Sequence, residues 1–207
     1  MKKLSLITLL ISLFIITGCV KKQYQSPLFD AKFAEESQAV KDLLISQFPK
    51  PPSGFKWIMF QGVALRQPIH WSQYKTNKVY TSSIESVAKN GTFETGLTIQ
   101  RVSNIKKITN ISSLKYIVDY VKIFEADKNN KTLKLSFGGT KEGATIIYKY
   151  RNTLPNLKPV IVYKYLLANE KDDYAVIITI ESTEKKWNKI WKDYGLVIFN
   201  KISVLPY

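Results

Sequence analysis

The stretch PVIVYKYLLANEKDDYAVIITIES, residues 159–182, decides the fold of this chain. Its two ends, 159–167 and 174–182, are rich in β-branched and aromatic residues, and the polar sequence ANEKDD lies between them. Strand-forming runs joined by a short polar connection predict a β-hairpin. Two more such runs, 131–137 and 144–150, come just before it, and together the four runs predict an antiparallel meander.

Helices are predicted on both sides of this meander. Residues 112–126 carry apolar side chains at helical spacing, with Ser112 or Ser113 as the N-cap. Those side chains are Leu114, Ile117, Val118, Val121 and Phe124. A last helix is expected after Ser182 or Thr183. The residues on its apolar face are Trp187, Ile190, Trp191, Tyr194 and Ile198.

The two ends of the predicted domain also have readable patterns. Residues 30–48 predict a helix that Asp30 caps and that the sequence PKPP, 49–52, ends. The sequence KISVL, 201–205, predicts a short final strand.

Strands are expected between the first two helices. Residues 55–60 and 63–67 flank a Gln-Gly turn and predict a hairpin, and residues 95–102 alternate as a strand does. The segment 68–92 has no clear pattern and stays unassigned, as a possible long excursion. The whole order predicts an α+β domain in which helices pack on the faces of an antiparallel β-sheet.

The N-terminus has the three parts of a secretory signal peptide. Lys2 and Lys3 are followed by a thirteen-residue apolar run, 4–16, and then by small residues that lead to Cys19. A helix that spans a membrane needs about 20 apolar residues, so this run is too short to remain in one.

The sequence from Ile16 to Cys19 resembles the lipobox of bacterial lipoproteins. The resemblance implies transfer of diacylglyceryl to the Cys19 thiol, cleavage between Gly18 and Cys19, and acylation of the new amino group. A thiol suits this role because its thiolate is a good nucleophile. An ordinary signal peptide with an incidental cysteine is the alternative. Cys19 is the single cysteine of the 207 residues, and lipidation would use it.

These features predict a signal peptide at 1–18, a tether at 19–29 and one domain at 30–207. Acyl chains on Cys19 would anchor the protein in a membrane. The residue after Cys19 is valine, not an aspartate that retains lipoproteins in the inner membrane. We therefore expect the outer membrane in a cell with two membranes, and the outer face of the cell membrane otherwise. Whether the domain faces the periplasm or the outside stays open.

The chain is strongly basic, with a formal net charge of +15. Such charge would suit anionic lipid or a cell-wall polymer as a binding surface. The lysines spread along the chain and form no block, which favours the other explanation, a biased genome composition. Nucleic acid is not expected for an exported, anchored protein. Four lysines of the last helix point away from its apolar face and are the predicted contacts with an anionic surface: Lys185, Lys186, Lys189 and Lys192.

No catalytic or cofactor motif is readable. His70 is the single histidine and the sole candidate general base, and no nucleophile can be paired with it from the sequence. Zinc sites need three or four Cys or His ligands. Residues 127–132 lack the glycine and closing glutamate of an EF-hand, and 136–143 lack the spacing of a phosphate loop. We expect no enzyme activity, metal or cofactor.

The aromatic side chains of the last helix have two interpretations. Trp187, Trp191 and Tyr194 at helical spacing form the core-facing side of the helix, or they line a groove for a ligand or partner.

The carboxyl-terminal part also resembles the PsbP family. The similar features are the hairpin 159–182, the tryptophan Trp187 after a short charged turn, the last helix and a closing strand at 202–204, together with the upstream GFKWIMFQGVALRQP. The resemblance implies an α/β/α sandwich and the role of an extrinsic binding subunit. The expected function is a non-catalytic binding or assembly module with an unknown envelope protein as partner. The alternative is a small-ligand carrier or hydrolase with a pocket between sheet and helix.

Overall fold

A seven-stranded antiparallel sheet forms the centre of the protein. The computed structural model describes residues 38–85, 94–139, 143–155 and 157–205. The order of strands in the sheet is β3-β4-β5-β9-β8-β7-β6. Their bounds are β3 Ser72–Lys75, β4 Val79–Ser83, β5 Gly96–Ser103, β6 Asn130–Gly139, β7 Ala144–Asn152, β8 Val160–Asn169 and β9 Tyr174–Thr183. The four strands predicted between 131 and 182 are therefore confirmed, and so is the strand predicted at 95–102.

The β8–β9 hairpin lies in the middle of this sheet, and β9 is buried on both faces. Val176, Ile178 and Ile180 pack into one hydrophobic core, while Ala175 and Ile177 pack into the other. A strand buried on both faces contains a continuous apolar run, as β9 does at residues 174–178. Each fully buried isoleucine or valine contributes about 1.5–3 kcal/mol, which makes this hairpin the main apolar element of the fold.

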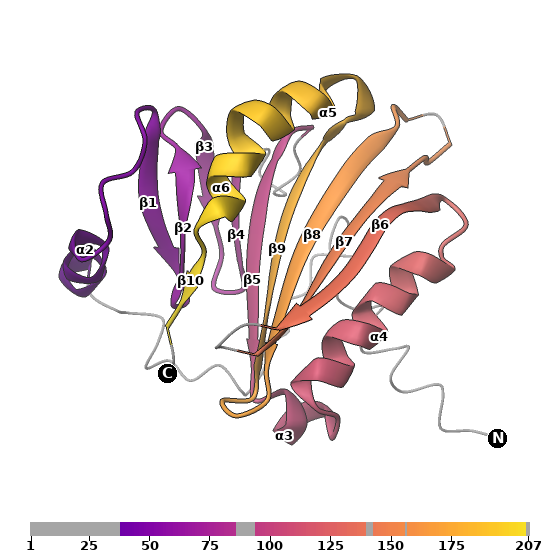
Figure 1. Ribbon diagram of the computed structural model, residues 1–207, viewed down its shortest axis with the longest axis horizontal. Helices are drawn as coiled ribbons and strands as arrows, with labels where there is room; N and C mark the ends of the chain where they lie inside the picture. The colour runs from indigo at the N-terminus through magenta and orange to yellow at the C-terminus, as the bar shows by residue number, and fades with distance from the viewer. Residues whose placement is uncertain (1–37, 86–93, 140–142, 156, 206–207) are drawn as a thin grey trace.

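Helix α4 (Ser113–Ala126) covers one face of the sheet (Figure 1). Its N-cap is Ser112, whose hydroxyl accepts a hydrogen bond of 3.2 Å from the Lys115 N–H. Ile117 and Val121 are buried against the sheet, whereas Leu114 faces solvent. The predicted helix is confirmed, although the place of Leu114 on its apolar face is wrong.

A short helix that the sequence did not predict, α3 (Ile105–Thr109), precedes α4. It begins beside the β8–β9 connection, where the Asp173 carboxylate accepts hydrogen bonds of 2.9 and 3.0 Å from the Lys106 N–H.

The opposite face of the main sheet is covered by the C-terminal helix and a second, smaller sheet (Figure 1). The helix consists of α5 (Glu184–Ile190), the π turn η2 (Trp191–Gly195) and α6 (Leu196–Asn200). The small sheet has the order β1-β2-β10, with β1 at Phe55–Phe60, β2 at Val63–Pro68 and β10 at Ser203–Val204. The predicted first hairpin and final strand are confirmed as elements, but they pair with each other and not with the main sheet.

The segment left unassigned contributes two strands, β3 and β4, which extend the main sheet beyond β5. They are short and polar, so hydrophobic periodicity did not reveal them. Tyr80 of β4 is buried and its hydroxyl donates a hydrogen bond to the Gln67 side chain of β2. This contact joins the two sheets.

Helix α2 (Gln38–Ser46) is the described part of the helix predicted at 30–48. Asp30, its predicted cap, lies outside the described residues. The proline segment after α2 packs on β1, because Phe48 stacks on Trp57 at 4.6 Å and the Trp57 Nε1–H donates to the Pro49 carbonyl at 2.8 Å.

Candidate binding surface on the C-terminal helix

The C-terminal helix widens by one π turn in the middle of its aromatic segment. The Leu196 N–H donates to the Trp191 carbonyl, five residues earlier, which is the hydrogen bond of a π turn. Gly195 lies under the Trp191 ring, and a Cβ atom there would come within 2.5 Å of Cε3. Single π turns inside α-helices are frequent at functional sites, and this one sets the direction of the side chains that follow.

Aromatic rings connect this turn to the main sheet. Trp191 stacks on Trp187 with ring centroids 5.5 Å apart and on Phe199 at 5.9 Å. Tyr163 of β8 lies 4.5 Å from the Trp191 ring and 4.9 Å from Phe199. Trp187 is buried in the core, whereas Trp191 and Phe199 are only partly covered. The core-facing interpretation is confirmed for Trp187, and Trp191 and Tyr194 pack against the same core. The use of this face by a ligand or partner stays a prediction.

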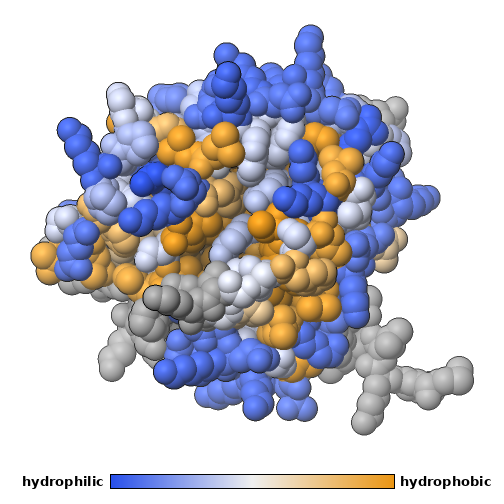
Figure 2. Space-filling view, in the orientation of Figure 1, coloured by the Kyte–Doolittle hydropathy of each residue, from blue (hydrophilic) through white to orange (hydrophobic). Residues whose placement is uncertain are grey.

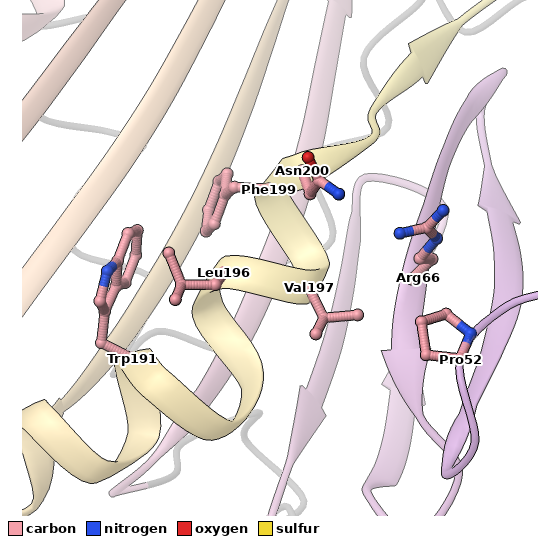
Figure 3. A pocket seen from close by; sticks show the side chains of 7 residues that line it. All are labelled: Pro52, Arg66, Trp191, Leu196, Val197, Phe199 and Asn200. Atoms are coloured by element: carbon pink, nitrogen blue, oxygen red, sulfur yellow. The ribbon is translucent and has the colours of Figure 1, made fainter.

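An open groove of about 450 Å³ runs along α6 (Figure 3). Its lining comprises Pro52, Arg66, Trp191, Leu196, Val197, Phe199 and Asn200. Leu196 is 55% exposed, although it lies between the Trp191 and Phe199 side chains in the lining of the groove. Seen from the side of Figure 1, hydrophobic residues gather around a hollow near the middle of the molecule (Figure 2).

Arg66 is the charged residue of this groove and comes from β2, on the wall opposite Trp191 (Figure 3). Its Cζ atom lies 5.3 Å from the centre of the Trp57 ring, a cation–π contact that holds the guanidinium in place. The Arg66 Nε is buried and has no hydrogen-bond partner among the described residues. A guanidinium held in place on the wall of a groove suits recognition of a carboxylate or phosphate.

Tyr194 continues the aromatic surface toward the N-terminal half of the domain. Its ring lies 5.2 Å from Trp71 and 6.4 Å from Phe55. The Tyr194 hydroxyl is 3.5 Å from His70 Nε2, at the long limit for a hydrogen bond. His70 is exposed, and the rings of His70 and Tyr194 are 5.7 Å apart. The structure thus places the sole histidine beside a tyrosine whose ring packs on other aromatic rings.

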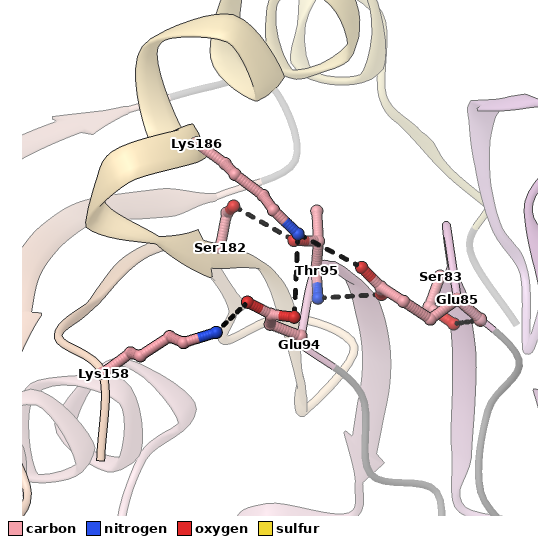
Figure 4. A network of polar contacts seen from close by, with 7 residues as sticks. All are labelled: Ser83, Glu85, Glu94, Thr95, Lys158, Ser182 and Lys186. Atoms are coloured by element: carbon pink, nitrogen blue, oxygen red, sulfur yellow. Dashed lines mark hydrogen bonds and ion pairs between the residues drawn. The ribbon is translucent and has the colours of Figure 1, made fainter.

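The four lysines predicted to contact an anionic surface are all exposed, but they differ in their neighbours. Lys186 lies between two carboxylates, 3.9 Å from Glu85 and 3.6 Å from Glu94 (Figure 4). Lys189 lies 3.8 Å from Asp193. Lys185 and Lys192 form no ion pair with any residue that the structure describes.

The carboxylates near Lys186 belong to a polar network that joins α5 to β5 and β9 (Figure 4). The Glu85 carboxylate accepts a hydrogen bond of 3.1 Å from the Thr95 N–H, and the Thr95 and Ser182 hydroxyls are 3.1 Å apart. Lys158 adds an ion pair of 3.7 Å with Glu94. Lys186 therefore connects α5 to the main sheet through its ion pairs, in addition to carrying positive charge at the surface.

A polar cluster also lies between α4 and the sheet. Lys164 is buried, and its ammonium donates to the Tyr120 hydroxyl at 3.3 Å and to the Thr179 hydroxyl at 3.2 Å. It also lies 4.7 Å from the centre of the Phe124 ring. Burial raises the pKa of the nearby Glu181, and the positive charge of Lys164 acts in the opposite direction.

Sequence reasoning missed the residues that make the groove and this cluster. Arg66, Leu196 and Phe199 carry no motif, and only the folded chain brings β2 beside α6. Lys164 and Glu181 left a readable signal, because each is the single charged residue of a predominantly apolar strand. The lipidation and cleavage positions, Cys19 and Gly18, lie outside the described residues, as do the whole signal peptide and tether.

Two further kinds of feature are absent from the residues that the structure describes. Between residues 38 and 205, apart from the gaps given above, no group of three or more His, Cys, Asp or Glu side chains is arranged to hold a metal ion. Within the same ranges, none of the helices combines the length and apolar character needed to cross a membrane.

No protein-family model matches the sequence, and no curated protein matches it either. Similar solved structures exist. The cyanobacterial PsbP of Synechocystis has a TM-score of 0.50 at 8% identity, over 77% of this chain and 99% of that one. The Ran-binding protein Mog1p of Saccharomyces cerevisiae has a TM-score of 0.48 at 12% identity, over 72% and 95%. A Pseudomonas aeruginosa protein of unknown function has a TM-score of 0.45 at 10% identity, over 69% of this chain and 92% of that one. The likeness to PsbP confirms the PsbP-like fold, and the fold alone.

Proposed function

We propose that this protein is a lipid-anchored lipoprotein of the cell envelope that acts as a non-catalytic binding or assembly module. Its partner would be an envelope protein that docks on the groove along α6. The lipobox at Ile16–Cys19 supports the anchor, and the groove supports the binding role. Processing of the signal peptide and lipidation of Cys19 belong to this proposal, as does a place in the outer membrane where the cell has two membranes.

The exposed Leu196 is the observation that carries the binding role. Large apolar side chains in a groove with a polar rim mark interaction sites. Leu196 has Trp191 and Phe199 on one side and Pro52 with Arg66 on the other. A partner that inserts an apolar side chain beside Leu196 and a carboxylate beside Arg66 would fit both features.

The geometry favours a macromolecular partner over a small ligand. Pockets for small molecules usually bury 70–90% or more of the ligand. This groove is open, with its central leucine more than half exposed. Arg66 is the ionisable residue of its lining, and a guanidinium does not serve as a general base at neutral pH. A carrier or hydrolase function is therefore the weaker candidate.

Contact with an anionic surface is a second candidate function, which the lysines of the last helix support. Lys185 and Lys192 carry charge that no described carboxylate neutralises. A lysine near an anionic lipid surface contributes about 1 kcal/mol, so the pair would add to the affinity given by the acyl chains.

Site-specific photo-crosslinking in intact cells tests the docking surface. A photoreactive residue at position 196 should capture an envelope protein, and Arg66→Gln should reduce the yield. The same residue at position 108, where Ile108 is 41% exposed on α3, is the matched control and should capture nothing comparable. Equal capture from both positions would show that the groove is not the docking surface.

Mass analysis of the membrane fraction tests the anchor. The intact mass should show the loss of residues 1–18 and added acyl mass, and a Cys19→Ala variant should stay unprocessed. Normal processing and lipidation of that variant would contradict the anchor while leaving the groove to be judged by crosslinking.

A further inference from the structure

The main sheet has two edges, and they differ in length. Strand β3 ends the sheet on one side with four residues, whereas β6 ends it on the other side with ten. Among the residues that the structure describes, β6 pairs only with β7. An edge strand leaves half of its backbone N–H and C=O groups without a strand partner, and a long one is a template for pairing with another chain.

The side chains of β6 divide by chemistry between the two faces of the sheet. Lys134 lies opposite Lys149, whose ammonium is 4.9 Å from the Trp187 ring centre, so both lysines are on the face of the C-terminal helix. Phe137 lies opposite Ile146, which is in the core under α4. Phe137 is 69% exposed. The edge therefore presents positive charge on one face and an uncovered apolar side chain on the other.

The two lysines repel each other across the β6–β7 pair. Neither forms an ion pair with a described carboxylate. Burial lowers the pKa of Lys149, and the charge of Lys134 lowers it further. Like charges directly opposite each other destabilise a strand pair, and a carboxylate beside them would remove that cost.

We propose that the free edge of β6 binds an extended acidic segment of a partner protein, which joins the main sheet as an eighth strand. Its carboxylates would lie on the face of Lys134 and Lys149, and its alternate apolar side chains would cover Phe137. A second copy of this chain fits less well, because its own β6 would bring two more lysines to that face. The site is separate from the groove along α6 and does not depend on lipidation of Cys19.

Two blocked peptides and the purified full-length protein in detergent micelles provide the test. The first peptide alternates glutamate and valine, and the second has lysine in place of each glutamate. Backbone amide hydrogen exchange should show that the glutamate peptide protects the β6 amides while the lysine peptide does not. Lys134→Glu should lower the affinity for the glutamate peptide by about tenfold and raise that for the lysine peptide. Lys75→Glu, on the short edge strand β3, should leave both affinities unchanged.

Three outcomes would overturn the proposal. The first is protection outside β6, and the second is equal binding of both peptides by the unmodified protein. The third is protection of β6 that rises with protein concentration in the absence of peptide, since this would show self-pairing through the edge. The Phe137→Ser variant should have a reduced affinity for the glutamate peptide if the apolar side chains of the bound strand cover Phe137. An unchanged affinity would show that Phe137 is not part of the binding site.

Discussion

Gly195 and Trp191 fit each other within the π turn of the C-terminal helix. The Trp191 ring occupies the space that a side chain at position 195 would need, and its Cε3 atom would lie 2.5 Å from a Cβ there. Because Trp191 also stacks on Phe199, the glycine helps to position the two aromatic side chains that line the groove.

Replacement of Gly195 by alanine should displace the Trp191 ring and lower the free energy of unfolding by about 1–3 kcal/mol, as overpacking does. Tryptophan fluorescence and urea denaturation measure the two effects. Gly139→Ala is the control, because a Cβ at that position meets nothing within 4 Å. Equal and small effects of both variants would show that the Gly195–Trp191 fit is not tight.

The lysines of the last helix should divide into two classes in binding to anionic vesicles. The double variant Lys185→Gln/Lys192→Gln should lose about ten- to thirtyfold in affinity at low salt, since each lysine near the surface contributes about 1 kcal/mol. Lys186→Gln/Lys189→Gln removes the same charge but should lose less, because carboxylates lie within 4 Å of both lysines.

Vesicle co-sedimentation at rising salt measures this difference. Binding should fade as the Debye length falls from about 10 Å at 0.1 M to about 3 Å at 1 M. Binding that is insensitive to salt and to both double variants, or no binding at low salt, would contradict a role of the lysines in surface binding. The basic charge would then be explained by the composition of the genome.

The carboxyl of Glu181, a half-buried residue, should make the free energy of unfolding depend on pH. Its pKa is raised above the ordinary 4.5 by burial, so the folded chain keeps a proton that the unfolded chain has lost. The stability from this group is fully present below the unfolded pKa and is lost as the pH rises through the folded pKa. Urea denaturation at several pH values gives the free energy of unfolding of the unmodified protein and of Glu181→Gln. The value of the unmodified protein minus that of the variant should decrease as the pH rises above 4.5. A constant difference would contradict this.

Lys164 should hold down the pKa of Glu181. Lys164→Met removes the positive charge that lowers this pKa, so the pKa should rise further. A carbon-13 titration of the Glu181 carboxyl by NMR measures the change. Lys122→Met, an exposed lysine of α4, is the control and should have little effect. A pKa of Glu181 that falls in the Lys164 variant would contradict the direction assigned to the Lys164 charge.

The sequence by itself predicted the central hairpin, the helix of Ser113–Ala126 and the α+β class, because these features depend on local patterns. Continuous apolar runs such as 174–182 and a serine cap ahead of helical spacing act within a few residues of each other. The polar strands β3 and β4 gave no such signal, since they form by pairing with β5 and not by their own composition.

The groove and the free edge were decided by tertiary structure alone. Arg66 and Leu196 are 130 positions apart in the sequence, and they line one groove only because β10 pairs with β2 and brings α6 beside it. Lys134 and Lys149 face each other because a bulge after Thr132 shifts the register of β6 against β7. Local periodicity predicts which residues share a face of one helix or strand. The pairing of distant elements depends on how the whole chain buries its apolar surface.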